Sequence, residues 1–300
     1  MKIKQVQTLS KMLVILAFLS PFLPLKSKDI IWYDGNHAVS YFVQTSTDPV
    51  VKIALDMFEG DIKSVTGKKA IKSNKKTANI RIIELDKASV SLKQRLVKQG
   101  IKVEEIHRQT DGFLILIVGD QIVIIGTNGR GTAYGVLELS RLAGVNPWVW
   151  WGDVVPEKKQ QLTIDSSFTT LQGASVEYRG IFINDEDWSL RPWSYGNYEK
   201  AEFGKIGIQT YKKIFQLLMR LRANTIWPAM HEGTKAFFNI PGAKAVADSC
   251  GIAIGSSHCE PLLRNNLAEW NETKRGSFNY ITNKQQVQNY WAERLKEVKL

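Results

Sequence analysis

The chain has 300 residues, of which 44% are hydrophobic and 23% charged, a balance that excludes a disordered protein and supplies enough apolar material for one large or two medium domains. Two cysteines, Cys250 and Cys259, exclude a disulfide-dense scaffold and a four-thiolate zinc site, and they leave open either one bridge or two buried thiols. The formal charge of the whole chain is +11. Apart from the lysines in residues 1–28 and a small lysine group at 68–76, the basic residues are scattered along the sequence. We therefore expect a solvated basic surface and no nucleic-acid partner.

Residues 1–28 have the pattern of a secretory signal peptide. Lysines precede an apolar run at residues 12–25 that contains Pro21 and Pro24. A run of this length is too short to cross about 30 Å of hydrocarbon as a helix, and the two prolines shorten it further. We therefore expect cleavage near Ser27, a periplasmic or secreted mature protein, and no membrane partner.

Residues 29–172 are expected to form a small α+β domain. A helix should begin after the N-cap Asp48, with Pro49 in its first position, and should end at Gly67. The other predicted elements are strands at 30–33, 39–44 and 79–85, a helix at 90–98, a hairpin of 113–118 with 122–126, and a helix at 132–142. A polar stretch up to about Gly173 is interpreted as the domain boundary.

Residues 173–300 change to a rhythm of strand, loop and helix. Strands are predicted at 176–183, 224–227 and 252–255, and helices at 210–222, at 243–248 and from about 285. In the last helix, an apolar stripe is expected to be buried, formed by Val287, Trp291, Leu295 and Val298. Repeated βα units predict a parallel sheet, and a closed eight-stranded barrel takes roughly 250 residues. The predicted fold class is therefore α/β: a small α+β N-terminal domain followed by the first half of a (β/α)8 TIM barrel, truncated.

The glycine-rich segment at residues 126–132 lies between a strand and a helix, as phosphate-binding loops do. It has Thr132 where a Walker loop needs lysine, and its glycine spacing does not fit a dinucleotide site. Glycines that turn a strand into a helix explain the segment better, so we reject a nucleotide site.

Polar and aromatic side chains follow all three predicted strands of residues 173–300. The first strand ends in Asn184, Asp185, Glu186 and Asp187, while the other two are followed by WPAMHE at 227–232 and SHCE at 257–260. Because the carboxyl ends of parallel strands face one crevice, we expect these side chains to converge there. Indole faces stack on sugar rings, and carboxylates, amides and imidazoles bind hydroxyls, so the clusters predict a carbohydrate pocket. The absence of HExxH, CxxC and GxSxG motifs disfavours a metal site and a serine hydrolase.

The same segments resemble the N-terminal part of glycoside hydrolase family 115, the xylan α-1,2-glucuronidases. The resemblance rests on RGIFINDE at 179–186, LRANTIWPAM at 221–230 and GSSHCEP at 255–261. It covers about residue 111 onward, and Cys259 stands where family members commonly have a second histidine. Residues 131–135 and 144–148 resemble the α+β domain that precedes the barrel in this group and in hexosaminidase-like hydrolases.

The resemblance implies an inverting hydrolysis that removes (4-O-methyl)glucuronic acid from glucuronoxylan or aldouronic oligosaccharides, without a cofactor or a metal. Asn184, Asp185, Trp227 and His258 would line the uronic acid subsite, with Glu186 and Glu260 behind them. The catalytic acid and base are expected beyond Leu300, so the full-length parent, which could be a homodimer, would be active and the 300-residue chain alone inactive.

Two other functions remain open from the residues. One is a carbohydrate-binding remnant that keeps part of the pocket and catalyses nothing; it predicts oligosaccharide binding, weakened in Trp227→Ala, without turnover. The other is a different hexosaminidase-like glycoside hydrolase, whose catalytic carboxylates would lie near a fourth strand of the barrel.

Overall fold

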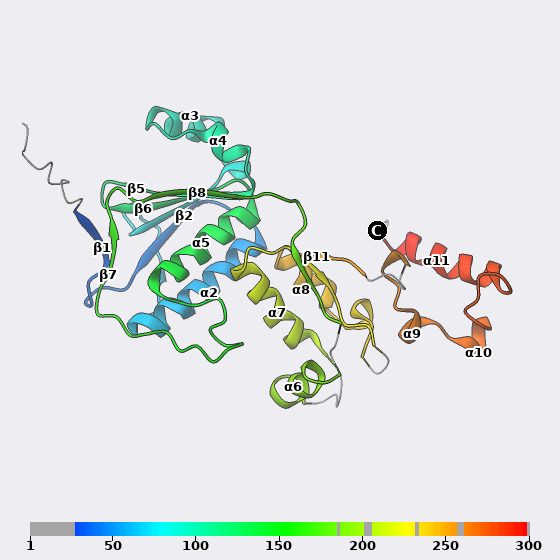
Figure 1. Cartoon of the computed structure of the whole chain (residues 1–300). Coiled ribbons are helices and arrows are strands. Elements are labelled where there is room, and N and C mark those ends of the chain that lie inside the picture. Colours follow the sequence, from blue (N-terminus) through cyan, green and yellow to red (C-terminus); the bar gives the residue numbers. More distant parts are fainter. Residues whose placement is uncertain (1–27, 185–186, 201–205, 232–233, 257–260, 299–300) are drawn as a thin grey trace, which may run out of the picture.

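The computed structural model describes residues 28–184, 187–200, 206–231, 234–256 and 261–298. They form a mixed α/β fold with a six-stranded sheet, a three-stranded sheet and a two-stranded ribbon (Figure 1). The ribbon pairs β1 (Asp29–Tyr33) with β7 (Leu162–Asp165) in antiparallel fashion. The predicted strand at 30–33 is therefore confirmed, but its partner comes from the polar stretch near residue 160.

The six-stranded sheet has the order β3-β2-β4-β6-β5-β8. Its strands are β2 (Ser40–Thr45), β3 (Ile71–Lys72), β4 (Ile80–Glu84), β5 (Thr110–Val118), β6 (Gln121–Gly126) and β8 (Thr169–Ala174). The first four in this order run parallel, and β5 and β8 join the sheet antiparallel. The β5–β6 hairpin was predicted, whereas β7 and β8 were missed. Because β8 includes Gly173, the predicted boundary falls inside a strand of this sheet.

Both faces of this sheet are covered, as the alternation along its central strands requires. Ile82 and Ile124 face a core formed with α2 (Pro49–Thr66) and α5 (Gly129–Ala143), which lie side by side on one face (Figure 1). Ile83 and Val123 face a smaller core on the other side. That core is closed by the short 3-10 helix η1 (Leu85–Lys87), α3 (Val90–Lys98) and α4 (Val103–His107).

Local capping explains where the two long helices begin and end. The Asp48 side chain accepts a hydrogen bond from the Val50 amide, and Gly67 ends α2 at a positive φ of 81°, as predicted. Helix α5 begins three residues earlier than predicted, because the Asn128 side chain caps it by accepting from the amide of Gly131. A Cβ on Gly131 would lie 2.1 Å from the carbonyl oxygen of Gly112, so this glycine permits close packing of strand and helix.

The three-stranded sheet is parallel and has the order β9-β10-β11, as the strand–helix rhythm predicted. Its elements are β9 (Gly180–Phe182), α6 (Leu190–Asn197), α7 (Ile208–Arg220), β10 (Thr225–Trp227), the 3-10 helix η2 (Phe237–Asn239), α8 (Ala243–Ser249) and β11 (Ala253–Ile254). Strand β9 is shorter than predicted, and α6 lies in a stretch expected to be a loop. The division into domains at 172 and 173 stays a prediction.

The last described segment consists of short helices and one long helix. These are the 3-10 helix η3 (Pro261–Leu263), α9 (Asn266–Glu269), α10 (Glu272–Arg275) and α11 (Lys284–Val298). The predicted apolar stripe of α11 is wrong at Leu295, which is 49% exposed, whereas Tyr290 and Arg294 are buried. Arg294 is drawn inward by Glu269, whose carboxylate lies 2.9 Å from its guanidinium. Among the helices in the described ranges, none is long and apolar enough to cross a membrane.

Candidate functional site

The carboxyl ends of β9, β10 and β11 lie at one edge of the three-stranded sheet. Trp227 is level with Phe182 in the register, and the Ile183 amide donates to the Trp227 carbonyl at 2.9 Å. On the other side, the Gly255 amide donates to the Ile226 carbonyl, also at 2.9 Å. The segments that follow the three strands therefore start side by side, as the sequence predicted.

Trp227 is the aromatic side chain at this edge. It is the last residue of β10, is 42% exposed, and packs edge-on against Phe182 with ring centroids 5.5 Å apart. Its indole also crosses the end of β11, because a Cβ on Gly255 would lie 2.3 Å from the indole Nε1. The glycine thus leaves the space that the ring occupies, and the ring remains accessible to a flat ligand.

A carboxylate–imidazole pair joins the loops that follow the first two strands. Nδ1 of His231 lies 3.0 Å from Oδ2 of Asp187, and Arg191 bonds the other oxygen of the same carboxylate. The hydrogen bond with His231, followed by the one from Arg191, holds the pKa of Asp187 below its ordinary value. The sequence named both clusters, but their pairing depends on loop geometry that no spacing reveals.

The predicted site residues divide into two groups. Asn184 is exposed two residues after the end of β9, and Trp227 ends the neighbouring strand, so these two lie at the same edge. Asp185, Glu186, His258 and Glu260 lie outside the described residues. Of the two cysteines, Cys250 is buried and free, and burial raises the pKa of its thiol to about 11, whereas Cys259 is outside the described part. No group of three potential metal ligands (His, Cys, Asp or Glu) comes together within the described ranges.

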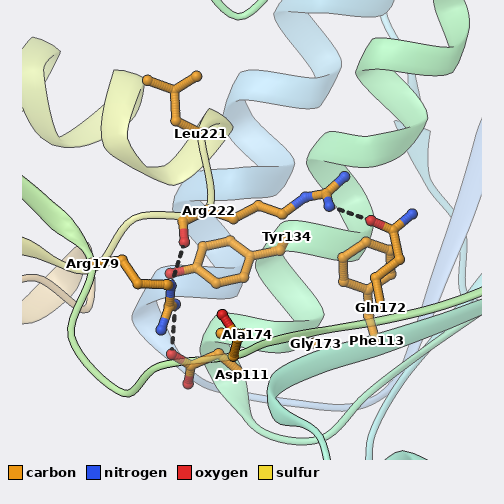
Figure 2. Close-up of a pocket in the computed structure, with 10 residues that line it drawn as sticks. Asp111, Phe113, Tyr134, Gln172, Gly173, Ala174, Arg179, Leu221 and Arg222 are labelled. Atoms are coloured by element: carbon orange, nitrogen blue, oxygen red, sulfur yellow. Dashed lines mark hydrogen bonds and ion pairs between the residues drawn. The ribbon is translucent and has the colours of Figure 1, made fainter.

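A pocket of about 240 Å³ lies at the opposite ends of the same strands (Figure 2). Arg179 and Arg222 line this pocket. Arg179 directly precedes β9, and Arg222 comes shortly before β10. Figure 2 shows Arg179 directed at Asp111, and the two side chains are 2.9 Å apart. Arg222 bonds Gln172 and, at 2.7 Å, Glu138. The charged side chains around this pocket are paired with one another. Its walls therefore form a structural junction and are not a second carbohydrate-binding cluster of the kind predicted at the carboxyl ends.

An indole and an amide at the carboxyl ends of parallel strands, with a carboxylate–imidazole pair beside them, are typical of carbohydrate-active α/β proteins. The family comparison gives the same class. Residues 172–300 match the family model described as Glycosyl hydrolase family 115. Residues 172–300 are therefore similar to this family, as the sequence resemblance indicated.

A search of solved structures agrees with this similarity. The chain is similar to a family GH115 4-O-methyl-α-glucuronidase with specificity for decorated arabinogalactans, at 40% sequence identity and a TM-score of 0.78. The match covers 89% of this chain and 35% of that protein, so the chain spans about a third of the relative's length. The search of curated proteins finds no match.

More distant similarities are to hexosaminidases. A mutant β-hexosaminidase of Streptomyces plicatus matches with a TM-score of 0.49 at 12% identity, over 77% of this chain and 42% of that one. A β-N-acetylhexosaminidase of Bacteroides fragilis matches with a TM-score of 0.47 at 12% identity, over 91% and 54%. These values are too low to assign a fold or an activity.

The space beneath the indole of Trp227 allows a direct test of the site. We expect Gly255→Ala to push the indole away from the end of β11, because the added methyl would overlap the ring. The change should weaken binding of a xylo-oligosaccharide carrying glucuronic acid about fivefold, measured by calorimetry. Gly196→Ala is the matched control, since a Cβ there meets nothing within 4 Å. Equal affinity of wild type and Gly255→Ala would show that the position of this indole is irrelevant to binding.

Proposed function

We propose that this chain supplies part of the uronic acid subsite of an inverting α-glucuronidase, which removes (4-O-methyl)glucuronic acid from a polysaccharide. The observation that carries the proposal is the shared edge of β9 and β10, where Trp227 ends β10 and Asn184 comes two residues after the adjacent parallel strand β9. The family match over residues 172–300 and the 40%-identical glucuronidase support it. Asp185 and His258, which follow β9 and β11 in the sequence, would complete the subsite.

The three βα units are proposed to be the first part of a (β/α)8 barrel. Parallel sheets are normally covered on both faces. In β10, Ile226 is fully buried beneath the helices, whereas Trp227, on the opposite face of the sheet, is 42% exposed. Ile181, on the edge strand β9, is level with Ile226 and yet 44% exposed. Further strands that close a barrel would cover Ile181 and leave the carboxyl ends open to substrate.

The described residues suit substrate binding rather than bond cleavage. Inversion needs a general acid and a general base roughly 6.5–9.5 Å apart, on opposite faces of the sugar. At the described edge the carboxylate is that of Asp187, which is already engaged by His231 and Arg191. This pair ties together the loops around Asn184 and Trp227, while the acid and base are proposed to lie beyond Leu300. The 300-residue chain is accordingly proposed to bind sugar without turnover.

Two glycans are candidates for the polysaccharide that carries the uronic acid. The sequence resemblance favours glucuronoxylan, whereas the 40%-identical relative is specific for decorated arabinogalactans. A subsite that binds the terminal uronic acid would accept either glycan, and loops outside the subsite would determine which glycan is preferred. Export to the periplasm or the medium is proposed from residues 1–28, and the N-terminal residue of the mature protein, read by mass spectrometry, tests it.

Removal of the indole provides the main test of the binding role. We expect Trp227→Ala to weaken binding of an aldouronic tetrasaccharide about tenfold, because the exposed ring face is lost. Trp148→Ala, at another half-exposed indole, should bind like wild type. Calorimetry at fixed pH measures both affinities. Unchanged binding in Trp227→Ala would contradict the subsite.

A turnover assay of the same protein separates the enzyme part from a binding module. Release of glucuronic acid by the 300-residue chain, at a rate near that of a full-length relative, would contradict the proposed position of the acid and base. If a longer parent hydrolyses the substrate and this chain only binds it, the whole protein is an enzyme and not a carbohydrate-binding remnant.

A further inference from the structure

A second hollow, of about 310 Å³, is lined by residues of α2 and α7 and by none of the residues at the strand ends. Helix α2 contributes Met57 and Gly60 to its walls, α7 contributes Lys212, Lys213 and Gln216, and Trp150 closes one side. The volume is within the range of small-molecule sites, about 300–1,000 Å³. The hollow combines an aromatic wall, two ammonium groups and an amide.

Lys213 is the chemically unusual group of this hollow. It is half-buried, and burial, together with the charges of Lys212 and Arg220, lowers the pKa of its ammonium. Within the described residues, Lys213 forms no ion pair with a carboxylate. Arg220 is already bound through two hydrogen bonds of 2.8 Å to Asp61. Asp56 also lines the hollow, but it is exposed to solvent, which screens its negative charge. The charge beside Lys213 is therefore positive.

The wall beside this ammonium is rigid and aromatic. The Trp150 ring is stacked on those of Trp151 and Trp193, with centroids 4.4 and 5.5 Å apart. The Lys213 ammonium lies 5.1 Å from the centroid of Trp150. The hollow is large enough for the ring of a small ligand. An ammonium beside an indole suits a ligand that has both an anionic group and an apolar face.

Gly60 adds an independent observation. It lies inside α2, where glycine costs about 1 kcal/mol relative to alanine. A Cβ at this position would meet nothing within 4 Å, so packing within the protein does not require the glycine. Its missing side chain instead enlarges the hollow opposite Lys213.

From these features we infer that the hollow is a secondary binding site for a sugar carrying a carboxylate, separate from the strand-end subsite. The Lys213 ammonium would pair with the carboxylate, Gln216 would bond ring hydroxyls, and the Trp150 wall would contact the C–H face of the ring. Such a site would hold an acidic polysaccharide chain at a distance from the reacting bond. The inference does not depend on the proposed hydrolysis.

Calorimetry with glucuronic acid, glucose and acetate tests this site. The protein is Trp227→Ala, so that binding at the strand ends is weakened and the hollow dominates. In this background we expect glucuronic acid to bind more tightly than either glucose or acetate. Lys213→Met should weaken its binding about tenfold, while Lys98→Met, an exposed lysine change on α3, should leave it unchanged.

Filling the hollow gives a second test that leaves the charge intact. Gly60→Gln should keep α2 folded, confirmed by circular dichroism, and should weaken glucuronic acid binding to a similar extent. Acetate binding as tightly as glucuronic acid would reduce the site to a simple anion site and overturn the inference. Equal affinity of Lys213→Met and its parent would also overturn it, whatever the turnover assay shows.

Discussion

Asp111→Asn is expected to lower the free energy of unfolding by about 3 kcal/mol. Asp111 is only 4% exposed, and its carboxylate accepts hydrogen bonds from Arg179 at 2.9 Å and from Arg130 and Asn128 at 3.0 Å. An amide at this position removes the charge that both guanidinium groups require, and it places an N–H group against other donors. The cost is therefore that of leaving two partly buried cations without the carboxylate that they share.

Urea denaturation, followed by circular dichroism, measures this effect. Asp120→Asn is the matched control, because Asp120 is exposed in the turn between β5 and β6 and the same chemical change should cost almost nothing there. Equal midpoints for the two variants would mean that the Asp111 network contributes no net stability.

The contribution of Asp111 should also depend on pH. Burial raises the pKa of Asp111, but the hydrogen bonds from Arg179 and Asn128 and the charge of Arg130 outweigh it, so the pKa lies below its ordinary value of 3.8. A lowered folded-state pKa stabilises the folded protein above the unfolded-state value, and this stability is lost as the pH falls through the folded-state pKa. The difference between wild type and Asp111→Asn should thus be complete above about pH 5 and should shrink below pH 3.8.

Asp111 belongs to a set of ion pairs that connect the two predicted domains. Each pair joins a carboxylate from residues 29–172 to an arginine from residues 173–300: Asp61 to Arg220, Asp111 to Arg179 and Glu138 to Arg222. The Tyr134 hydroxyl also donates to the Ala223 carbonyl at 3.1 Å. These contacts fix the starts of β9 and β10, and thereby the direction in which their carboxyl ends point. Cutting the chain at residue 172 would leave three carboxylates without these partners.

Most elements of the fold could be predicted because local signals define them. The caps at Asp48 and Gly67 and the β5–β6 turn act within a few residues, so their positions can be read from the sequence. Strand β8 was missed because most of its residues are polar and none of them is buried, and its pairing with β5 spans about sixty residues of sequence. Helix α6 was missed because Pro192 and aromatic side chains obscure the period of a short helix.

The candidate site could be predicted only to the level of strand ends. Parallel βα units place Asn184 and Trp227 at one edge by topology alone. The contact of Asp187 with His231 depends on how two loops fold back, and neither loop has a spacing that indicates it. The junction at Asp111 was also missed, because a lone carboxylate before a strand looks like an ordinary surface residue until its arginine partners are known.

Gly180→Ala is expected to cost about 3 kcal/mol of unfolding free energy, because it disturbs the pairing of the two strands that lead to the site. Gly180 begins β9 and lies opposite Thr225 of β10. A Cβ there would be 1.7 Å from the Thr225 carbonyl oxygen, and because this oxygen belongs to the backbone it cannot move away as a side chain would. The two strands would have to separate, which would shift Asn184 relative to Trp227.

Gly60→Ala is the matched control, because the same methyl group meets nothing there and should raise stability by about 0.5–1 kcal/mol through better helix propensity. Denaturation midpoints give the opposite signs expected for the two variants. Binding of the aldouronic tetrasaccharide under native conditions then tests the geometric step. A folded Gly180→Ala protein that binds as tightly as wild type would show that the spacing of β9 and β10 does not set the subsite, and the strand-end proposal would fail with it.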